Sequence, residues 1–177
     1  MICEQCGQEF DATNRRGITP RFCSATCRQR THRARKARQP LSEFRSERRW
    51  VRADDKRPIM PCGSSASSTN PGTWSTFAEV QASTAGDGFG VMLGSGLGCI
   101  DIDNCFDGDV VAPWASDYVN AMTEPILFVE RSVSGRGLHV FFRPVAESAG
   151  TRRAGIERYT RQRFIRTTFD SFTMKDR

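Results

Sequence analysis

Two close pairs of cysteines near the start of the chain constrain its fold more than any other feature. Cys3-x-x-Cys6 is followed, after sixteen residues, by Cys23-x-x-x-Cys27. Zinc prefers four thiolate or imidazole ligands in a tetrahedron, and two cysteine pairs at turns meet that need. The chain has seven cysteines and no apolar signal-peptide region, which favours a metal site over disulfides. We therefore expect residues 1–36 to form a small module around a structural zinc ion.

A basic segment follows the second cysteine pair. Ser24 is placed to cap a helix that begins inside this pair, and the segment resembles a treble-clef zinc finger. A helix this basic has almost no apolar face for a core, so we expect it to bind a nucleic-acid backbone, with a solvated charged helix as the alternative. The formal net charge of +6 agrees with such a partner. The predicted contacts are Arg28, Arg30, Arg33, Arg35, Lys36 and Arg38.

The rest of the chain has the pattern of an α+β domain. Residues 37–47 are a predicted linker, in which Pro40 would end a preceding helix. From residue 48 to 177, short apolar runs alternate with turn residues. The predicted elements are strands at 48–53, 57–60, 89–93, 98–103, 126–131, 137–143, 155–159 and 163–168, and helices at 74–83 and 112–122. No run approaches the roughly 20 apolar residues of a membrane span, so we expect a soluble, intracellular protein without a membrane partner.

The predicted strand at 98–103 carries two acids. Residues two apart in a strand share a face, so Asp101 and Asp103 point together while Ile100 and Ile102 point to the other face, under a helix. Neighbouring carboxylates repel each other and need a compensating cation when they are half-buried. Mg²⁺ or Mn²⁺, bound by carboxylates and substrate phosphates, would meet that need. The alternative is a strand end with two solvated acids.

A second cluster combines small residues with a cation and a histidine. A serine- and glycine-rich turn can offer backbone N–H groups to a phosphate, and a histidine on the following strand can donate to a triphosphate. The alternative is a hairpin with a buried structural histidine. The candidate nucleotide-binding residues are Ser132, Ser134, Gly135, Arg136, Gly137 and His139.

A third acid and a further arginine come later in the chain. Glu157 lies in the predicted strand 155–159, and Arg163 begins the next strand, where it can contact phosphate. A site with two divalent ions needs several bridging acids, which gives Glu157 a role beside Asp101 and Asp103. The alternative is a surface glutamate.

These clusters, in this order, resemble the archaeo-eukaryotic primase superfamily. The closest likeness is to the primase-polymerase domains of phages and mobile elements, and it covers roughly residues 48–168. The motifs are Asp101-x-Asp103, Ser132-x-Ser134-Gly135-x-Gly137-x-His139 and Ile156-Glu157 with the Arg-Phe strand after it, supported by the segments 56–61, 69–77 and 90–94.

The resemblance implies an RRM-like catalytic core with a mixed sheet. It implies that Asp101, Asp103 and Glu157 hold catalytic Mg²⁺ or Mn²⁺, and that His139 and the turn 134–137 hold the triphosphate of an incoming nucleotide. The partners would be a single-stranded DNA template and nucleoside triphosphates, in the cytoplasm of a bacterium or a phage-infected cell.

The sequence also departs from this family. Thr167-Thr168 stands where a Thr-Gly pair is usual, and the helicase half of many relatives is missing, so a separate replicative helicase is an expected partner. Two other functions remain open. One is a non-catalytic zinc-finger protein that binds nucleic acid as a replication accessory factor. The other is a metal-dependent nuclease that uses the same acids.

Overall fold

The computed structural model describes residues 1–10, 20–37 and 39–174, and the side chains of all of these except 32–37. The chain forms two compact units, residues 1–42 and residues 43–177. The division falls inside the predicted linker 37–47.

In the first unit, helix α1 spans Ala25–Ala37. Its start agrees with the predicted cap, because the Ser24 hydroxyl accepts the backbone N–H of Cys27 at 3.2 Å.

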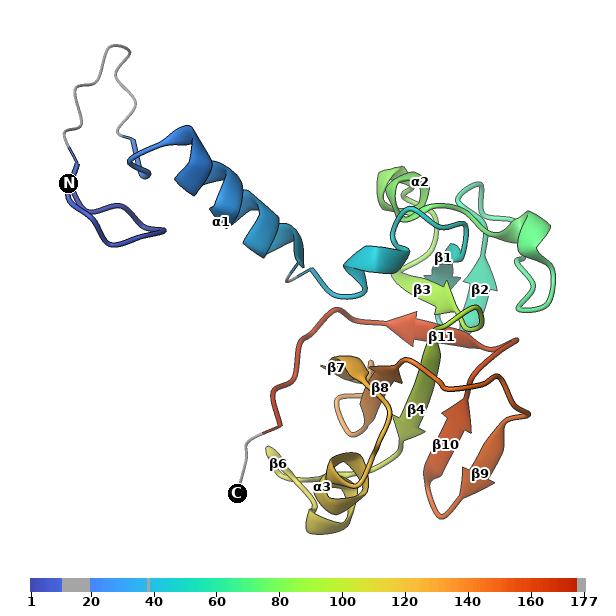
Figure 1. The fold of residues 1–177 in the computed structure, drawn as a ribbon. Coiled ribbons are helices and arrows are strands. Elements are labelled where there is room, and N and C mark those ends of the chain that lie inside the picture. Colours follow the sequence, from blue (N-terminus) through green and yellow to red (C-terminus); the bar gives the residue numbers. More distant parts are fainter. Residues whose placement is uncertain (11–19, 38, 175–177) are drawn as a thin grey trace. The chain divides into compact units, whose positions relative to one another are not determined.

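The second unit contains two larger sheets and a small hairpin (Figure 1). One sheet has the order β11-β3-β1-β2 and the other has the order β7-β8-β4-β10-β9. The strands of the first are β1 (Trp50–Asp54), β2 (Arg57–Ile59), β3 (Gly88–Met92) and β11 (Phe164–Thr167). Those of the second are β4 (Gly98–Ile102), β7 (Ile126–Arg131), β8 (Leu138–Phe142), β9 (Thr151–Arg153) and β10 (Ile156–Tyr159). The hairpin consists of β5 (Phe106–Asp107) and β6 (Val110–Val111).

Few helices accompany these strands. They are α2 (Phe77–Ala82), α3 (Pro113–Asn120) and the single 3-10 turns η1 (Ser42–Phe44) and η2 (Pro71–Thr73). The predicted α+β class is therefore confirmed. The strand pairs of the described residues run antiparallel, where the sequence had suggested a mixed sheet. The reason is that hairpins join β7 to β8 and β9 to β10, and both β8 and β10 run opposite to β4 between them.

Most predicted elements lie within two or three residues of the observed ones, and the start of α2 shows why boundaries move. Apolar spacing predicted a helix from residue 74, but the helix begins at Phe77. Thr76 caps it through a capping box with Glu79, whose carboxylate accepts the Thr76 backbone N–H at 2.6 Å. The residue before the cap, Ser75, exchanges two backbone hydrogen bonds with Trp50 of β1, both 2.8 Å long. That sheet contact keeps the preceding turn out of the helix.

The glycine-rich turn between β3 and β4 separates the two sheets. Gly94 and Leu97 exchange backbone hydrogen bonds of 3.0 and 3.1 Å across it. The strands on either side do not pair with each other, since β3 joins the four-stranded sheet and β4 becomes the central strand of the five-stranded sheet. Ile100 and Ile102 of β4 pack against Ala115 and Val119 of α3, so the predicted helix over the isoleucine face is confirmed. The opposite face of β4 carries Asp101.

Candidate functional site

The four predicted metal-binding cysteines come together in the first unit. The Sγ atoms of Cys3, Cys6, Cys23 and Cys27 all lie within 4.8 Å of one another. The separation is 3.7 Å between Cys6 and Cys23 and 3.5 Å between Cys23 and Cys27. With Zn–S bonds of about 2.3 Å, a tetrahedral site separates its sulfur atoms by about 3.8 Å. The cluster therefore has the dimensions to bind a metal ion such as zinc.

Backbone groups around Cys3 favour the thiolate that a metal requires. A hydrogen bond from the Cys23 backbone, with others from Cys6 and Gln5, outweighs desolvation and lowers the pKa of the Cys3 thiol to about 6. Cys3 is only 1% exposed, so an anion there is well shielded from solvent. Hydrogen bonds with the neighbouring thiols, that of Cys27 first, raise the pKa of Cys23 to about 12. Thiols that share protons in this way lose them when a cation binds between them.

The predicted basic contacts begin directly after this cluster. Arg28 and Arg30 lie on α1 and are exposed. Exposure is a condition for the contact with a nucleic-acid backbone that the sequence predicts. The side chains of Arg33, Arg35 and Lys36, and the whole of Arg38, lie outside the described residues.

In the second unit, five ionisable side chains form one row across the five-stranded sheet. Each residue stands directly opposite the next on the neighbouring strand, so all five lie on one face of the sheet. From β7 to β9 the row reads Glu130, His139, Asp101, Glu157 and Arg152. The register thus brings together three residues that are far apart in the sequence and that the motifs had singled out.

His139 sits between two carboxylates of this row. It is 7% exposed, with its Nδ1 2.8 Å from Glu130 Oε1 and its Nε2 3.7 Å from Asp101 Oδ1. Burial lowers the pKa of His139, but the hydrogen bond and charge of Glu130, with the charge of Asp101, outweigh it, so the pKa is raised. Because Nδ1 faces Glu130, the nitrogen left for a ligand at the site is Nε2.

Glu130 is a residue that the sequence analysis missed. Its carboxylate is completely buried and accepts four hydrogen bonds. Besides His139, the donors are the Thr167 hydroxyl at 2.7 Å and the backbone N–H groups of Thr168 at 3.1 Å and Phe169 at 2.8 Å. These residues lie at and just after the end of β11, so Glu130 ties the five-stranded sheet to a strand of the other sheet. The only signal in the sequence was a glutamate at the end of an apolar strand.

The three predicted metal-binding acids differ in their surroundings. Burial raises the pKa of Asp101, as do the charges of Asp103 and Glu157, while His139 and Arg163 oppose this. Asp103 lies just past the end of β4 and is exposed. Within the described part of the chain, the four cysteines are the one group whose ligand atoms lie close enough to share an ion. The three carboxylates would therefore have to draw together to bind a divalent metal.

Basic and hydroxyl groups hold Glu157 in its present position. Its side chain is 8% exposed and forms an ion pair with Arg152 of β9. Arg163 Nη2 lies 3.6 Å from the same carboxylate, and the Tyr159 hydroxyl donates to it at 2.6 Å. Glu157 is thus a buried carboxylate whose charge is compensated by arginine, which rules out the surface glutamate considered above.

The predicted phosphate-binding turn packs against the end of β4. Ser132 Oγ accepts the Gly137 N–H at 3.1 Å, and Ser134 Oγ accepts the Arg136 N–H at 3.3 Å. Gly135 has a φ of +72°, which favours glycine. A Cβ on Gly137 would lie 2.6 Å from the backbone oxygen of Ile102, so only glycine lets the turn approach the strand this closely. Ile102 stands between Asp101 and Asp103, so the turn and the acids share one end of β4.

No protein-family model matches the sequence, and a search of curated proteins finds no significant relative. Among the described helices, none is long and apolar enough to cross a membrane.

Proposed function

We propose that this protein is a template-directed nucleotidyltransferase, a DNA primase/polymerase that makes or extends primers on single-stranded DNA. The observation that carries the proposal is the juxtaposition of Asp101 and Glu157 on adjacent strands, with Asp103 and the 132–137 turn at the end of β4. Paired acids beside a serine- and glycine-rich turn suit a reaction in which divalent ions and a triphosphate meet.

The order of strands supports an RRM-like core. The chain runs from β4 through α3 to β7, then to β8 and later to β10, and the sheet order is β7-β8-β4-β10. In a split βαβ arrangement, the two strands that the helix connects are separated by another strand. Here α3 connects β4 to β7, and β8 lies between them. Helix α3 covers the isoleucine face, and the ionisable row lies on the other face of the sheet. The β9–β10 hairpin takes the place of a second helix.

Each residue of the site has a role in such a reaction. The 3′-hydroxyl of a primer or first nucleotide attacks the α-phosphate of a nucleoside triphosphate, and pyrophosphate leaves. Asp101, Asp103 and Glu157 would hold Mg²⁺ or Mn²⁺, which when bound stabilises the charge on the transferring phosphoryl group. Glu130 holds Nδ1 of His139 and raises the pKa of the ring, and the protonated ring would donate from Nε2 to the triphosphate.

Arginine side chains complete the charge balance of the site. Arg152 and Arg163 compensate Glu157 in the structure described here. With a divalent cation held by the acids, Arg152 and Arg163 would be available to the phosphates of the substrate. The predicted nucleotide-binding residue Arg163 is exposed, in keeping with such a contact. Ser132, Ser134, Gly135, Arg136 and Gly137 would hold the remaining phosphate oxygens.

The first unit would deliver the template. Cys3, Cys6, Cys23 and Cys27 would hold a structural zinc ion, which would fix the start of α1. The basic residues of that helix would bind the DNA backbone without reading its sequence. A separate replicative helicase would expose the single strand.

Nucleotide incorporation on a single-stranded DNA template tests the proposal. Reactions contain Mg²⁺ or Mn²⁺, with and without a primer, and compare the natural protein with Asp101→Asn and Glu157→Gln. Asp107→Asn is the matched control, since Asp107 is an exposed acid in the β5–β6 hairpin. We expect incorporation by the natural protein and the control but not by the site variants. Incorporation that survives both site substitutions would contradict the proposed roles.

A second candidate function is a non-catalytic DNA-binding accessory protein. One observation favours it. The carboxylate of Glu157 is paired with Arg152 and Arg163, which occupy positions that a metal ion would need. Manganese binding followed by electron paramagnetic resonance separates the two functions. DNA binding without incorporation, and without manganese binding that depends on Asp101, would favour the accessory protein. Template cleavage in lanes without nucleotides would instead identify a nuclease.

A further inference from the structure

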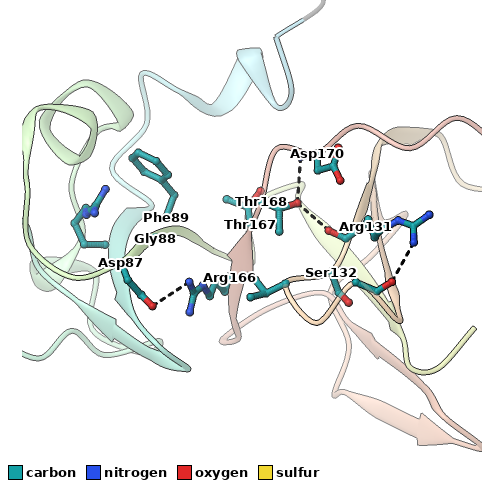
Figure 2. A pocket seen from close by; sticks show the side chains of 12 residues that line it. Asp87, Gly88, Phe89, Arg131, Ser132, Arg166, Thr167, Thr168 and Asp170 are labelled. Carbon is teal, nitrogen blue, oxygen red and sulfur yellow. Dashed lines mark hydrogen bonds and ion pairs between the residues drawn. The ribbon is translucent and has the colours of Figure 1, made fainter. Parts of the chain in front are cut away.

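A pocket of about 430 Å³ opens in the second unit beside the 132–137 turn (Figure 2). Asp87, Gly88 and Phe89 from the start of β3 form one side, and Arg131 and Ser132 from the end of β7 form the other. The end of β11 lies between these two sides. The two sheets of the unit thus both contribute to the wall, and the volume lies in the range of small-molecule sites.

Arg52 of β1 is the most unusual group in this wall. It is 8% exposed, and its guanidinium donates to the backbone oxygens of Ala85 at 2.5 Å and Gly86 at 3.4 Å. The same group lies over the ring of Phe89, 4.6 Å from its centroid. Among the residues that the structure describes, no carboxylate forms an ion pair with Arg52. A buried cation held by neutral groups alone gains most from an anionic ligand, because its charge is otherwise uncompensated.

Two further arginines face the same space. Arg166 Nη2 pairs with Asp87 at 3.2 Å, and its guanidinium passes over Gly88, where a Cβ would lie 3.0 Å from Arg166 Nε. Glycine at that position keeps room for the guanidinium in the wall.

Arg131 completes the set of cations. It donates to the Gly135 backbone oxygen at 3.2 Å, and its ion-pair partner Asp109 is 3.9 Å away and fully exposed, so that pair is weak. The second carboxylate of the wall, Asp170, is exposed. Three guanidinium groups and two carboxylates therefore give the pocket a net positive charge.

We propose that this pocket is a phosphate-binding site that takes either a nucleotide or a phosphate of a single-stranded DNA chain. The choice between these sources rests on the proposed function, whereas the preference for an anion rests on Arg52, Arg131 and Arg166. Ser132 and Gly135 belong both to the pocket and to the turn beside the acids, so a phosphate held here lies next to the end of β4. The pocket thus extends the substrate-binding surface from the five-stranded sheet to the other sheet.

Calorimetric titration of the full chain in buffer without added divalent metal tests this site. The probes are inorganic triphosphate, a deoxynucleoside triphosphate and an oligothymidylate strand. Arg52→Ala removes the buried cation. Because that change also removes hydrogen bonds, a second pair of variants alters charge alone: Val133→Glu and Val133→Lys, at a wall residue that is 52% exposed. Arg153→Ala, on the exposed edge strand β9, is the control for loss of one positive charge.

The expected result is a change in affinity that follows the charge of the pocket. Arg52→Ala should weaken binding of at least one probe by about ten- to a hundredfold, the loss expected for a charge-assisted hydrogen bond. Val133→Glu should weaken and Val133→Lys should strengthen binding of that same probe, while Arg153→Ala changes it little. An effect on both triphosphates identifies a nucleotide site, and an effect on the oligonucleotide alone identifies a DNA-strand site.

The proposal would be overturned if the Arg52 and Val133 substitutions left the affinities for all three probes unchanged. These measurements do not require catalysis, so they separate this inference from the proposed function. If the protein incorporates nucleotides but its affinities do not change with these substitutions, the proposed polymerase function stands and the phosphate-binding pocket does not. If binding follows the charge of the pocket but the protein incorporates no nucleotide, the phosphate-binding pocket stands and the proposed polymerase function does not.

Discussion

Replacing Glu130 by alanine should be among the most destabilising single changes in the second unit. The substitution leaves four buried or half-buried donors without their acceptor: the ring of His139, the hydroxyl of Thr167 and the backbone N–H groups of Thr168 and Phe169. Breaking a buried ion pair by removing one partner costs about 3–5 kcal/mol. We expect a loss of that size in the free energy of unfolding. Glu130→Gln keeps an acceptor oxygen and the volume of the side chain, so it should cost about half as much.

Urea denaturation followed by tryptophan fluorescence measures this loss. All three tryptophans lie in the second unit, and Trp50 is completely buried, so the signal reports that unit. Glu43→Ala is the matched control, because Glu43 pairs with Arg143 at the surface and such pairs contribute about 0–1 kcal/mol. A Glu130→Ala protein that unfolds at the same urea concentration as Glu43→Ala would refute the reasoning.

The same interaction gives the stability a defined pH dependence. Glu130 raises the pKa of His139 in the folded protein above its unfolded value of about 6.5. A raised pKa means that the folded state holds the proton more tightly, so this contribution is fully present below the unfolded pKa. It is lost as the pH rises through the folded pKa. Removing Glu130 leaves burial of His139 less opposed, so the loss on the alkaline side should shrink. A decline of unchanged size in Glu130→Ala would assign it to another group.

Three further outcomes follow from local geometry. Cys23→Ser should abolish stoichiometric zinc binding, measured by elemental analysis, and leave the tryptophan-detected unfolding of the second unit unchanged; full zinc retention would argue against the four-cysteine site. Gly137→Ala should cost about 1–3 kcal/mol of unfolding free energy, because the new Cβ would lie 2.6 Å from a backbone oxygen. Gly135→Ala has open space around its Cβ and should cost only the roughly 1–2 kcal/mol of its left-handed backbone. A Gly137→Ala protein as stable as the natural one would contradict the close approach of the turn to β4. Thr76→Ala should cost about 1 kcal/mol through loss of the α2 capping box, measured by the same urea titration, and no change would mean that the cap is dispensable.

Local chemistry made several features predictable from the sequence. The spacing of Cys3, Cys6, Cys23 and Cys27 indicated a shared site, because each pair is held together by a few residues of chain. The period of two along β4 placed Ile100 and Ile102 under a helix and Asp101 on the opposite face. The position of the β7 strand followed from its apolar and β-branched residues.

Other features depend on which strands become neighbours. A period of two fixes the face on which a side chain lies, but it does not say which residue stands opposite on the next strand. The alignment of Glu130, His139, Asp101 and Glu157 therefore came only from the register of the folded sheet. The ion pair of Arg152 with Glu157 was hidden for the same reason, since β9 was not predicted as a strand.

What the sequence by itself determined about this protein is thus the content of its short segments: a cysteine cluster, a basic helix, and acids and a glycine turn on particular strand faces. The tertiary structure alone decided that β3 and β4, joined by a tight turn, enter different sheets. It also decided that Glu130 is buried and that Arg52 lines a pocket between those sheets. The physical reason is that short-range pattern is fixed by backbone geometry, whereas burial and cross-strand partners are fixed by packing between segments far apart in the chain.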